Sequence, residues 1–255
     1  MPPTPAPGLP AAFTPAEVVL HIPHAATHIP SFEGYVAGRA EIQQEIDLLT
    51  DWHTDALFRL AGAATVRCAF SRVFCDVERL PDAQEPMFAR GRGFFYTHRD
   101  NGTLLRTRLP GLPERVWQHY YQPHHAALTA AVAQALAGPG RCLLLDCHSF
   151  ADTPFQTDLN QATPRPDICL GTDDFHTPAW LLAAFRAAFE AAGFSVAVDA
   201  PYAGTLVPTA YYRQDARVLA LMVELNRRLY LRDDYTLDPA AQARIGAVLR
   251  SLVAA

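Results

Sequence analysis

The chain has 255 residues, half of them apolar, and a formal charge of −5. That length and composition are enough to bury one large core, so we expect a single domain over 15–255. Residues 1–14 are rich in Pro and Ala and are expected to form a tail. The acidic balance and the scattered basic residues argue against a nucleic-acid partner.

The sequence shows no targeting segment and no redox motif. It does not open with a basic, apolar signal segment, and no apolar stretch reaches the roughly 20 residues of a membrane helix. The five cysteines form no Cys-x-x-Cys pair, which is typical of small buried hydrophobes in a reducing compartment. We therefore expect a cytoplasmic protein without a membrane partner, and the pattern favours no particular oligomeric state.

Short apolar strands alternate with helical patterns along the chain. The expected strands lie at 18–22, within 64–77, and at 142–146, 168–171, 194–198 and 218–225. The expected helices lie at 41–62, 114–137, 178–192 and from Pro239 to the C-terminus. Leu, Met and Ala in the last strand would also suit a helix. This alternation predicts an α/β fold with a mixed, mainly parallel sheet flanked by helices.

Polar side chains follow three of the apolar runs, where the ligand sites of such sheets gather. His24 comes directly after Pro23 at the exit of the first strand, and His148 stands two positions after Asp146. Glu224 lies within the apolar run at 218–225. Two His and a carboxylate with one open position make a catalytic zinc site, and a further Glu that is not a ligand can accept a proton from water.

The carboxylate ligand is less obvious than the histidines. Asp51 and Asp55 lie four apart in the predicted helix and would share a face, while His53 would point elsewhere. We favour Asp51 as the third ligand. Asp146, two positions before His148, fits a carboxylate that supports a metal-bound imidazole.

Each of these residues also has a plainer interpretation. His24 could be a surface loop residue, and His148 a hydrogen-bonded core histidine. Glu224 could form an ion pair with Arg227 or Arg228, which follow it closely.

Eight segments in a fixed order give the sequence a family resemblance. It resembles the N-formylglutamate amidohydrolase (deformylase) family from about residue 18 to 232, through the segments IPHAATHIP (22–30), TDWHTDALF (50–58), SRVFCDVER (71–79), YYQPHHAAL (120–128), LLLDCHSF (143–150), DICLGTDD (167–174), PYAGTLVP (201–208) and ELNRRLY (224–230). The combination is specific, although no single segment is. Family members usually have Pro-His-Ser-Gly and Asp-Leu-Asn-Arg where this chain has Pro-His-Ala-Ala (23–26) and Asp-Val-Glu-Arg (76–79).

The resemblance implies a fold, an activity and a set of roles. The fold would be zinc-carboxypeptidase-like (phosphorylase/hydrolase-like), and the reaction would be hydrolysis of N-formyl-L-glutamate to formate and glutamate in histidine breakdown. His24, His148 and Glu224 follow the order of the two zinc-binding histidines and the catalytic glutamate of zinc carboxypeptidases. Position 27, where those enzymes have their carboxylate ligand, is Thr27, so that ligand must come from elsewhere.

On this hypothesis zinc is held by His24, Asp51 and His148, Glu224 is the general base, and the partner is a small N-acyl amino acid. The two carboxylates of N-formylglutamate would need fixed cations, and arginine suits them best. The candidate substrate-binding residues are Arg72, Arg79, Arg106, Arg213, Tyr202 and Gly204.

Three rival readings remain open. The same site could act on another N-acyl amino acid or a small peptide, or the chain could bind metal or ligand without turnover. A metal-independent hydrolase would have to use Ser149 or Cys147, although no Gly-x-Ser-x-Gly motif surrounds that serine. Two His and a carboxylate would also suit Fe²⁺ or Co²⁺.

Overall fold

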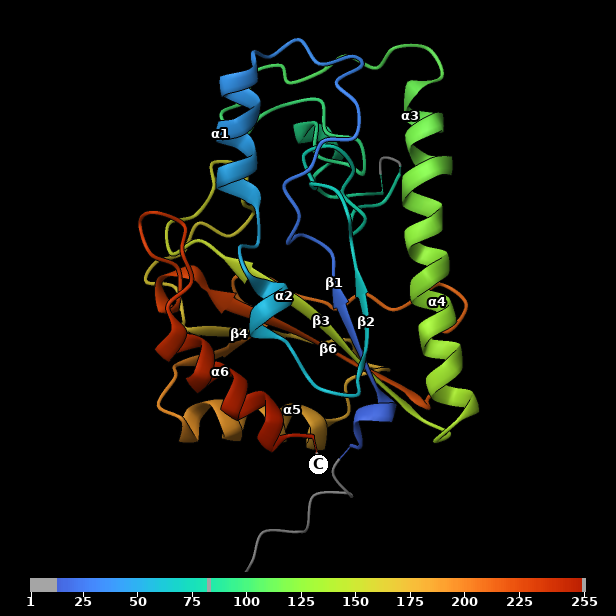
Figure 1. Ribbon diagram of the computed structural model, residues 1–255, viewed down its shortest axis with the longest axis vertical. Coiled ribbons are helices and arrows are strands. Elements are labelled where there is room, and N and C mark those ends of the chain that lie inside the picture. Colours follow the sequence, from blue (N-terminus) through green and yellow to red (C-terminus); the bar gives the residue numbers. More distant parts are fainter. Residues whose placement is uncertain (1–12, 82–83, 254–255) are drawn as a thin grey trace, which may run out of the picture.

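A six-stranded sheet forms the centre of the molecule in the computed structural model, which describes residues 13–81 and 84–253 (Figure 1). The strands are β1 Val18–Ile22, β2 Ala64–Arg67, β3 Cys142–Phe150, β4 Ile168–Gly171, β5 Val196–Val198 and β6 Val218–Asn226. Their order is β2-β1-β3-β6-β4-β5, and only β4 and β6 pair antiparallel. The expected mixed, mainly parallel sheet flanked by helices is confirmed.

Helices cover both faces of this sheet. The helices are α1 Arg39–Leu49, α2 Thr54–Leu57, α3 Leu112–Val116, α4 Gln122–Ala137, α5 Ala179–Ala191 and α6 Pro239–Ser251. A π-helical turn joins α3 to α4, so the two form one long column beside the sheet, and α5 and α6 lie together across its other side (Figure 1). Helix α1 and the irregular segment that follows β2 stand beyond one edge, at the top of the view.

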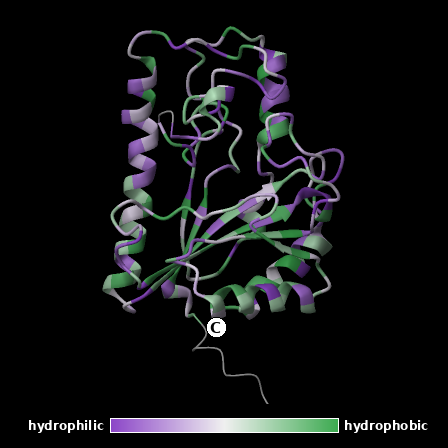
Figure 2. Ribbon diagram, turned by 180° about the vertical axis from the view of Figure 1, so that it is seen from behind, coloured by the Kyte–Doolittle hydropathy of each residue, from purple (hydrophilic) through white to green (hydrophobic). Residues whose placement is uncertain are grey.

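The two faces of the sheet have different environments because side chains alternate along each strand. Val19 and Leu144 pack against α4, whereas Leu20 and Leu145 pack with α5 and α6 on the opposite face. The strands are accordingly hydrophobic along most of their length (Figure 2). The polar exceptions on the α4 face lie toward the carboxyl ends of β1, β3 and β6, which point to the same edge of the sheet.

The helix predicted over 41–62 is wrong beyond Leu49. Thr50 is already extended, and His53 adopts a left-handed conformation with φ of +62° before the short α2 begins. The chain leaves the helix here because Asp51 is held by partners outside it: its backbone N–H donates to the carbonyl of His24, and its carboxylate accepts from the backbone of Ser149.

The strands predicted within 64–77 are also shorter than expected, since β2 ends at Arg67. The chain turns at Ser71, whose carbonyl accepts from the N–H groups of Phe74 and Cys75. The tail expected over 1–14 lies outside the described residues except for its last two. Of these, Phe13 belongs to the folded body, because its ring is buried and stacks on Trp180.

The state of the cysteines matches the sequence pattern. All five cysteines are buried and free, which agrees with their prediction as small core residues. Within residues 13–81 and 84–253, no helix is long and apolar enough to cross a membrane.

Candidate metal centre

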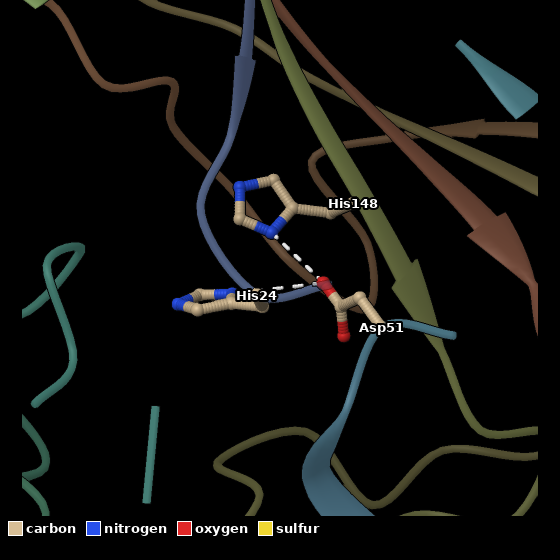
Figure 3. A group of neighbouring side chains, drawn as sticks. All are labelled: His24, Asp51 and His148. Atoms are coloured by element: carbon tan, nitrogen blue, oxygen red, sulfur yellow. Dashed lines mark hydrogen bonds and ion pairs between the residues drawn. The ribbon is translucent and has the colours of Figure 1, made fainter. Parts of the chain in front are cut away.

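Three side chains meet at the carboxyl edge of the sheet (Figure 3). His148 Nδ1 lies 3.2 Å from Asp51 Oδ2, and His24 Nδ1 lies 3.6 Å from the same oxygen. His24 follows β1, His148 lies on β3, and Asp51 follows α1, so the site joins three separate elements. The residues are only 2%, 5% and 1% exposed in that order. One ligand atom from each of the three residues lies within 4.8 Å of the other two, close enough to hold one metal ion.

Both imidazoles are oriented by a carboxylate on their far side. His24 Nε2 lies 2.8 Å from Asp76 Oδ1, and His148 Nε2 lies 3.0 Å from Asp146 Oδ1. A carboxylate can only accept here, so each Nε2 carries a proton, and each Nδ1 faces Asp51, where His148 Nδ1 donates to Oδ2 until a metal replaces that proton. His24 Nδ1 is buried and has no hydrogen-bond partner among the described residues. A buried lone pair aimed at a carboxylate and a second imidazole fits a metal ligand.

Asp51 is held as an anion by its surroundings. Burial alone would raise its pKa, but the contacts with His148 and His24 and the nearby Arg227 lower the pKa well below its usual range. Arg227 Nη2 donates to Asp51 Oδ1 at 3.0 Å, which leaves Oδ2 toward the histidines. The pKa of His148 is raised well above its usual value, because the contacts with Asp146 and Asp51 outweigh the effect of burial.

Glu224 lies beside this cluster with a free carboxylate oxygen. The parallel pairing of β3 and β6 sets Glu224 opposite His148, on the same face of the sheet. Its Oε2 is buried and has no hydrogen-bond partner among the described residues. Arg227 pairs with Asp51, and Arg228 pairs with Asp152 and Asp167, so the ion pair considered from the sequence does not form. Burial raises the pKa of Glu224 to about 8, within the range of a general base.

Two of the four candidate arginines converge on the site. Arg72 donates twice to Asp76 Oδ2, at 3.1 and 2.9 Å, and its Nη1 lies 4.0 Å from Asp51 Oδ1. Arg79 Nε lies 3.9 Å from the same oxygen of Asp76, and its side chain is 31% exposed. Their odd spacing would separate them on a regular strand, but the turn at Ser71 removes that restriction.

The other two arginines are not brought to the site. Arg106 is fully buried, donates to the carbonyls of Tyr96 and Phe74, and stacks on Phe95. Its role is therefore to support the segment behind the site. Arg213 pairs with Asp173 near the amino end of β6. This strand begins at Val218, six residues before Glu224, and six residues correspond to roughly 20 Å along a strand.

The segment of Tyr202 and Gly204 lies on the face of the sheet that carries Glu224. Cys169, which pairs with Glu224 across β4 and β6, donates its Sγ–H to the carbonyl of Tyr202. Gly171 permits this close approach, because a Cβ there would stand 2.2 Å from the carbonyl oxygen of Gly204. The Tyr202 hydroxyl is bonded to Arg165 and Asp158, so this tyrosine anchors the wall of the site.

The metal-independent alternatives find no support in the geometry. Ser149 Oγ accepts from Arg227 Nε at 3.3 Å, and no histidine in the described part of the chain is bonded to it. Cys147 points to the opposite face of the sheet and packs in the core beside α5 and α6. Burial also raises the pKa of its thiol, which disfavours a thiolate nucleophile.

Two residues that support the site were not predicted from the sequence. Asp76 binds His24, Arg72 and the Tyr96 hydroxyl at once, and Arg227 links Asp51 to the carbonyls of Leu48 and Ser149. Asp76 lies in a turn and Arg227 directly after β6, so neither belongs to a periodic pattern. The only sequence signal was their position inside the family-like segments 71–79 and 224–230.

The fold and the side-chain cluster together fit one class of protein, the hydrolases. The two histidines and the aspartate that converge on this α/β sheet could hold a metal ion, and they lie beside a buried glutamate whose Oε2 has no hydrogen-bond partner among the described residues, a set of groups suited to hydrolysis. The family model described as N-formylglutamate amidohydrolase matches residues 16–231. The chain belongs to this family.

Solved structures share the fold. The N-formylglutamate amidohydrolase from Ralstonia eutropha JMP134 is 24% identical and aligns with a TM-score of 0.79 over 96% of this chain and 95% of that one. The gene product Atu2144 from Agrobacterium tumefaciens is 19% identical and aligns with a TM-score of 0.67 over 92% of this chain and 88% of that one. No curated protein matches the chain significantly.

Proposed function

We propose that the protein hydrolyses the formyl amide of N-formyl-L-glutamate, giving formate and L-glutamate, with a divalent metal held by His24, Asp51 and His148. The observation that carries the proposal is the convergence of His24 Nδ1, His148 Nδ1 and Asp51 Oδ2 beside the unpaired carboxylate of Glu224. Membership of the N-formylglutamate amidohydrolase family supports the substrate.

A divalent ion at this site would supply a Lewis acid that acidifies water and polarises the amide oxygen. Glu224 accepts a proton from the attacking water as the water oxygen bonds to the formyl carbon. The carbon–nitrogen bond then breaks, and Glu224 returns the proton to the leaving amine. Arg72, whose Nη1 lies 4.0 Å from Asp51 Oδ1, would stabilise the charge that develops on the amide oxygen.

The substrate carboxylates need cations that are not fully used by the protein. Arg227 is bonded through Nε, Nη1 and Nη2 to groups of the protein, so it serves to hold Asp51. Arg79 donates to Glu85 through Nη1 at 3.1 Å, but its guanidinium is otherwise partly exposed beside Asp76, which makes it the better candidate for a carboxylate of the substrate. A planar guanidinium binds a carboxylate through two parallel hydrogen bonds.

Zinc is the first metal to test, because two imidazoles and one carboxylate with an open position suit it. Fe²⁺ and Co²⁺ suit the same donors. A place in histidine breakdown follows from the proposed substrate, and it is part of the proposal.

The test combines metal analysis with formate release. We expect about one metal per chain, formate release from N-formyl-L-glutamate, loss of that release on chelation, and recovery when metal is added. Metal-free protein that hydrolyses the substrate at the same rate would refute the proposal.

Two control substrates sharpen the result. N-formyl-L-alanine keeps the formyl amide but lacks the side-chain carboxylate, and N-acetyl-L-glutamate keeps both carboxylates but enlarges the acyl group. Faster turnover of either control than of N-formyl-L-glutamate would keep the hydrolase and overturn the substrate.

A further inference from the structure

A row of buried polar side chains continues the metal centre away from the substrate side. His148 Nε2 lies 3.0 Å from Asp146 Oδ1, and that oxygen lies 2.9 Å from His21 Nδ1. His21 Nε2 lies 2.8 Å from His124 Nε2 on α4. The row therefore links the helix to β1 and β3, and it ends at a ligand of the proposed metal.

The row follows from strand register. His21 on β1 pairs with Asp146 on β3, and Asp146 lies two residues before His148, so all three side chains point to the α4 face. His124 reaches the same face from the first turn of α4. No hydrolytic step proposed above uses His21 or His124, yet both are buried among polar partners.

The direction of each hydrogen bond near the metal centre is fixed by chemistry. The Asp146 carboxylate accepts only, so His148 Nε2 and His21 Nδ1 both donate to Oδ1, while the backbone N–H of Leu206 donates to Oδ2. Removing His21 would leave Asp146 buried with one donor fewer. The carboxylate would then be free to turn away from His148, which would loosen the tautomer that presents Nδ1 to the metal.

A second carboxylate, that of Glu78, also lies beside the His21 imidazole. Glu78 Oε1 lies 3.1 Å from His21 Nδ1 and 4.0 Å from His148 Nε2. His21, Glu78 and Asp146 are also close enough to hold a cation of their own. However, Asp146 Oδ1 is already shared between His21 and His148, so a metal there would have to break the link to His148. Hydrogen bonding is the arrangement that the distances favour.

We propose that His21, held by His124, is a positioning residue that acts through Asp146 to fix the orientation and tautomer of His148 and so raises the affinity for the metal. The proposal rests on the metal centre of the proposed function. It predicts an effect on metal binding itself, separate from any effect on turnover.

The experiment exploits the two ring positions of histidine. His21→Asn places an N–H₂ donor where Nδ1 lies, so it still reaches Asp146, whereas His21→Gln places the donor where Nε2 lies, toward His124. Zn²⁺ affinity is measured by competition with a chromophoric chelator, and the ligand field is followed by the visible absorption of the Co²⁺-loaded protein. We expect H21Q to bind Zn²⁺ about tenfold more weakly, the lower end of the range for outer-shell partners, with an altered Co²⁺ spectrum. H21N should stay within about threefold of the unaltered protein.

His176 provides a matched control. It is a fully buried histidine that contacts the Val218 carbonyl and accepts from the Arg213 N–H, away from the metal ligands. His176→Gln should lower thermal stability and leave Zn²⁺ affinity unchanged. Should H21Q not fold, His124→Leu tests the same row, and a decrease in Zn²⁺ affinity larger than that of H176Q is expected.

Three outcomes would overturn the inference. One is Zn²⁺ affinity of H21Q, or of H124L in its place, equal to that of the unaltered protein. The second is an equal loss in H21N and H21Q, which would mean a purely structural role. The third is a second equivalent of metal that disappears with H21Q, which would make His21 a ligand. Absence of any Zn²⁺ binding by the unaltered protein would instead refute the metal centre, and this inference with it.

Discussion

Replacing Glu224 by glutamine should lower the rate of hydrolysis by orders of magnitude and at the same time stabilise the metal-free protein. The side chain is buried, its Oε2 lacks a hydrogen-bond partner among the described residues, and burial raises its pKa to about 8. Glutamine has nearly the same shape as a protonated glutamate but cannot take up or release a proton. General acid–base catalysis contributes roughly 10²- to 10⁴-fold, so we expect kcat to fall by about that factor while the metal content stays unchanged.

The size of the stabilisation depends on pH. Below an ordinary glutamate pKa of about 4.5, Glu224 is protonated in both the folded and the unfolded chain, so it has no effect. Between about 4.5 and 8 the unfolded chain ionises first, so the unaltered protein loses stability as pH rises, and above about 8 the loss is complete. At about 1.4 kcal/mol per pKa unit, E224Q should unfold with a free energy on the order of 3–5 kcal/mol higher at pH 8. At pH 5 the difference should be under about 1 kcal/mol.

Urea unfolding of chelator-treated protein at pH 5 and pH 8 measures this difference. Glu114→Gln makes the same substitution on the exposed surface of α3 and should change stability by less than about 0.5 kcal/mol at either pH. A variant E224Q that is no more stable than the unaltered protein at pH 8 would refute the account of Glu224 as a buried, uncompensated carboxylate. Retained hydrolysis would refute its role as general base.

Three further predictions concern the metal and the substrate. The pKa of His148 is raised well above its usual value in the metal-free protein, so metal binding must displace a proton. Zn²⁺ affinity should therefore rise roughly tenfold per pH unit between about pH 6 and 8. Competition titrations that show no pH dependence would contradict this. Asp51→Ala should abolish stoichiometric metal binding. It should also lower the free energy of unfolding by about 3 kcal/mol in urea titrations, because Arg227 stays buried without its carboxylate partner. Unchanged stability would rule out that ion pair as a structural support. Arg79→Ala should raise KM for N-formyl-L-glutamate about tenfold or more, because a charge-assisted hydrogen bond to the substrate is lost. KM for N-formyl-L-alanine should change little. Equal changes for both substrates would exclude Arg79 from binding the side-chain carboxylate.

The site residues that follow or lie on strands could be predicted from the sequence. Apolar runs that end in polar residues located His24, His148 and Glu224, because parallel strands bring their carboxyl ends to one edge. The structure brings all three together at that edge. Asp51 was placed at the site for a reason that proved wrong: it does not lie on a helical face, since the helix ends at Leu49 and tertiary contacts override the local periodicity.

The loops could not be predicted in the same way. Arg72 and Arg79 approach each other only because the chain turns at Ser71, and no periodicity reports such a turn. Arg106 was expected to bind substrate because arginine suits a carboxylate. The sequence does not distinguish such an arginine from a fully buried one that donates to backbone carbonyls, as Arg106 does. Asp76 shows the converse error, because a turn aspartate gives no sign of the histidine that it orients.

The division between strands and loops suggests how the site tolerates change. His21 pairs with Asp146, and His148 pairs with Glu224, through the register of neighbouring parallel strands. A shift of register by one residue would turn the side chains of the shifted strand to the other face. The proposed metal ligand His148, the carboxylate of Asp146 and the proposed general base Glu224 therefore depend on one pairing scheme. The arginines proposed to contact the substrate, Arg72 and Arg79, lie instead within residues 71–79, outside this scheme. Substitutions there can alter which acyl amino acid is bound while the register keeps the hydrolytic groups in place, and we therefore expect substrate preference to change more readily than chemistry.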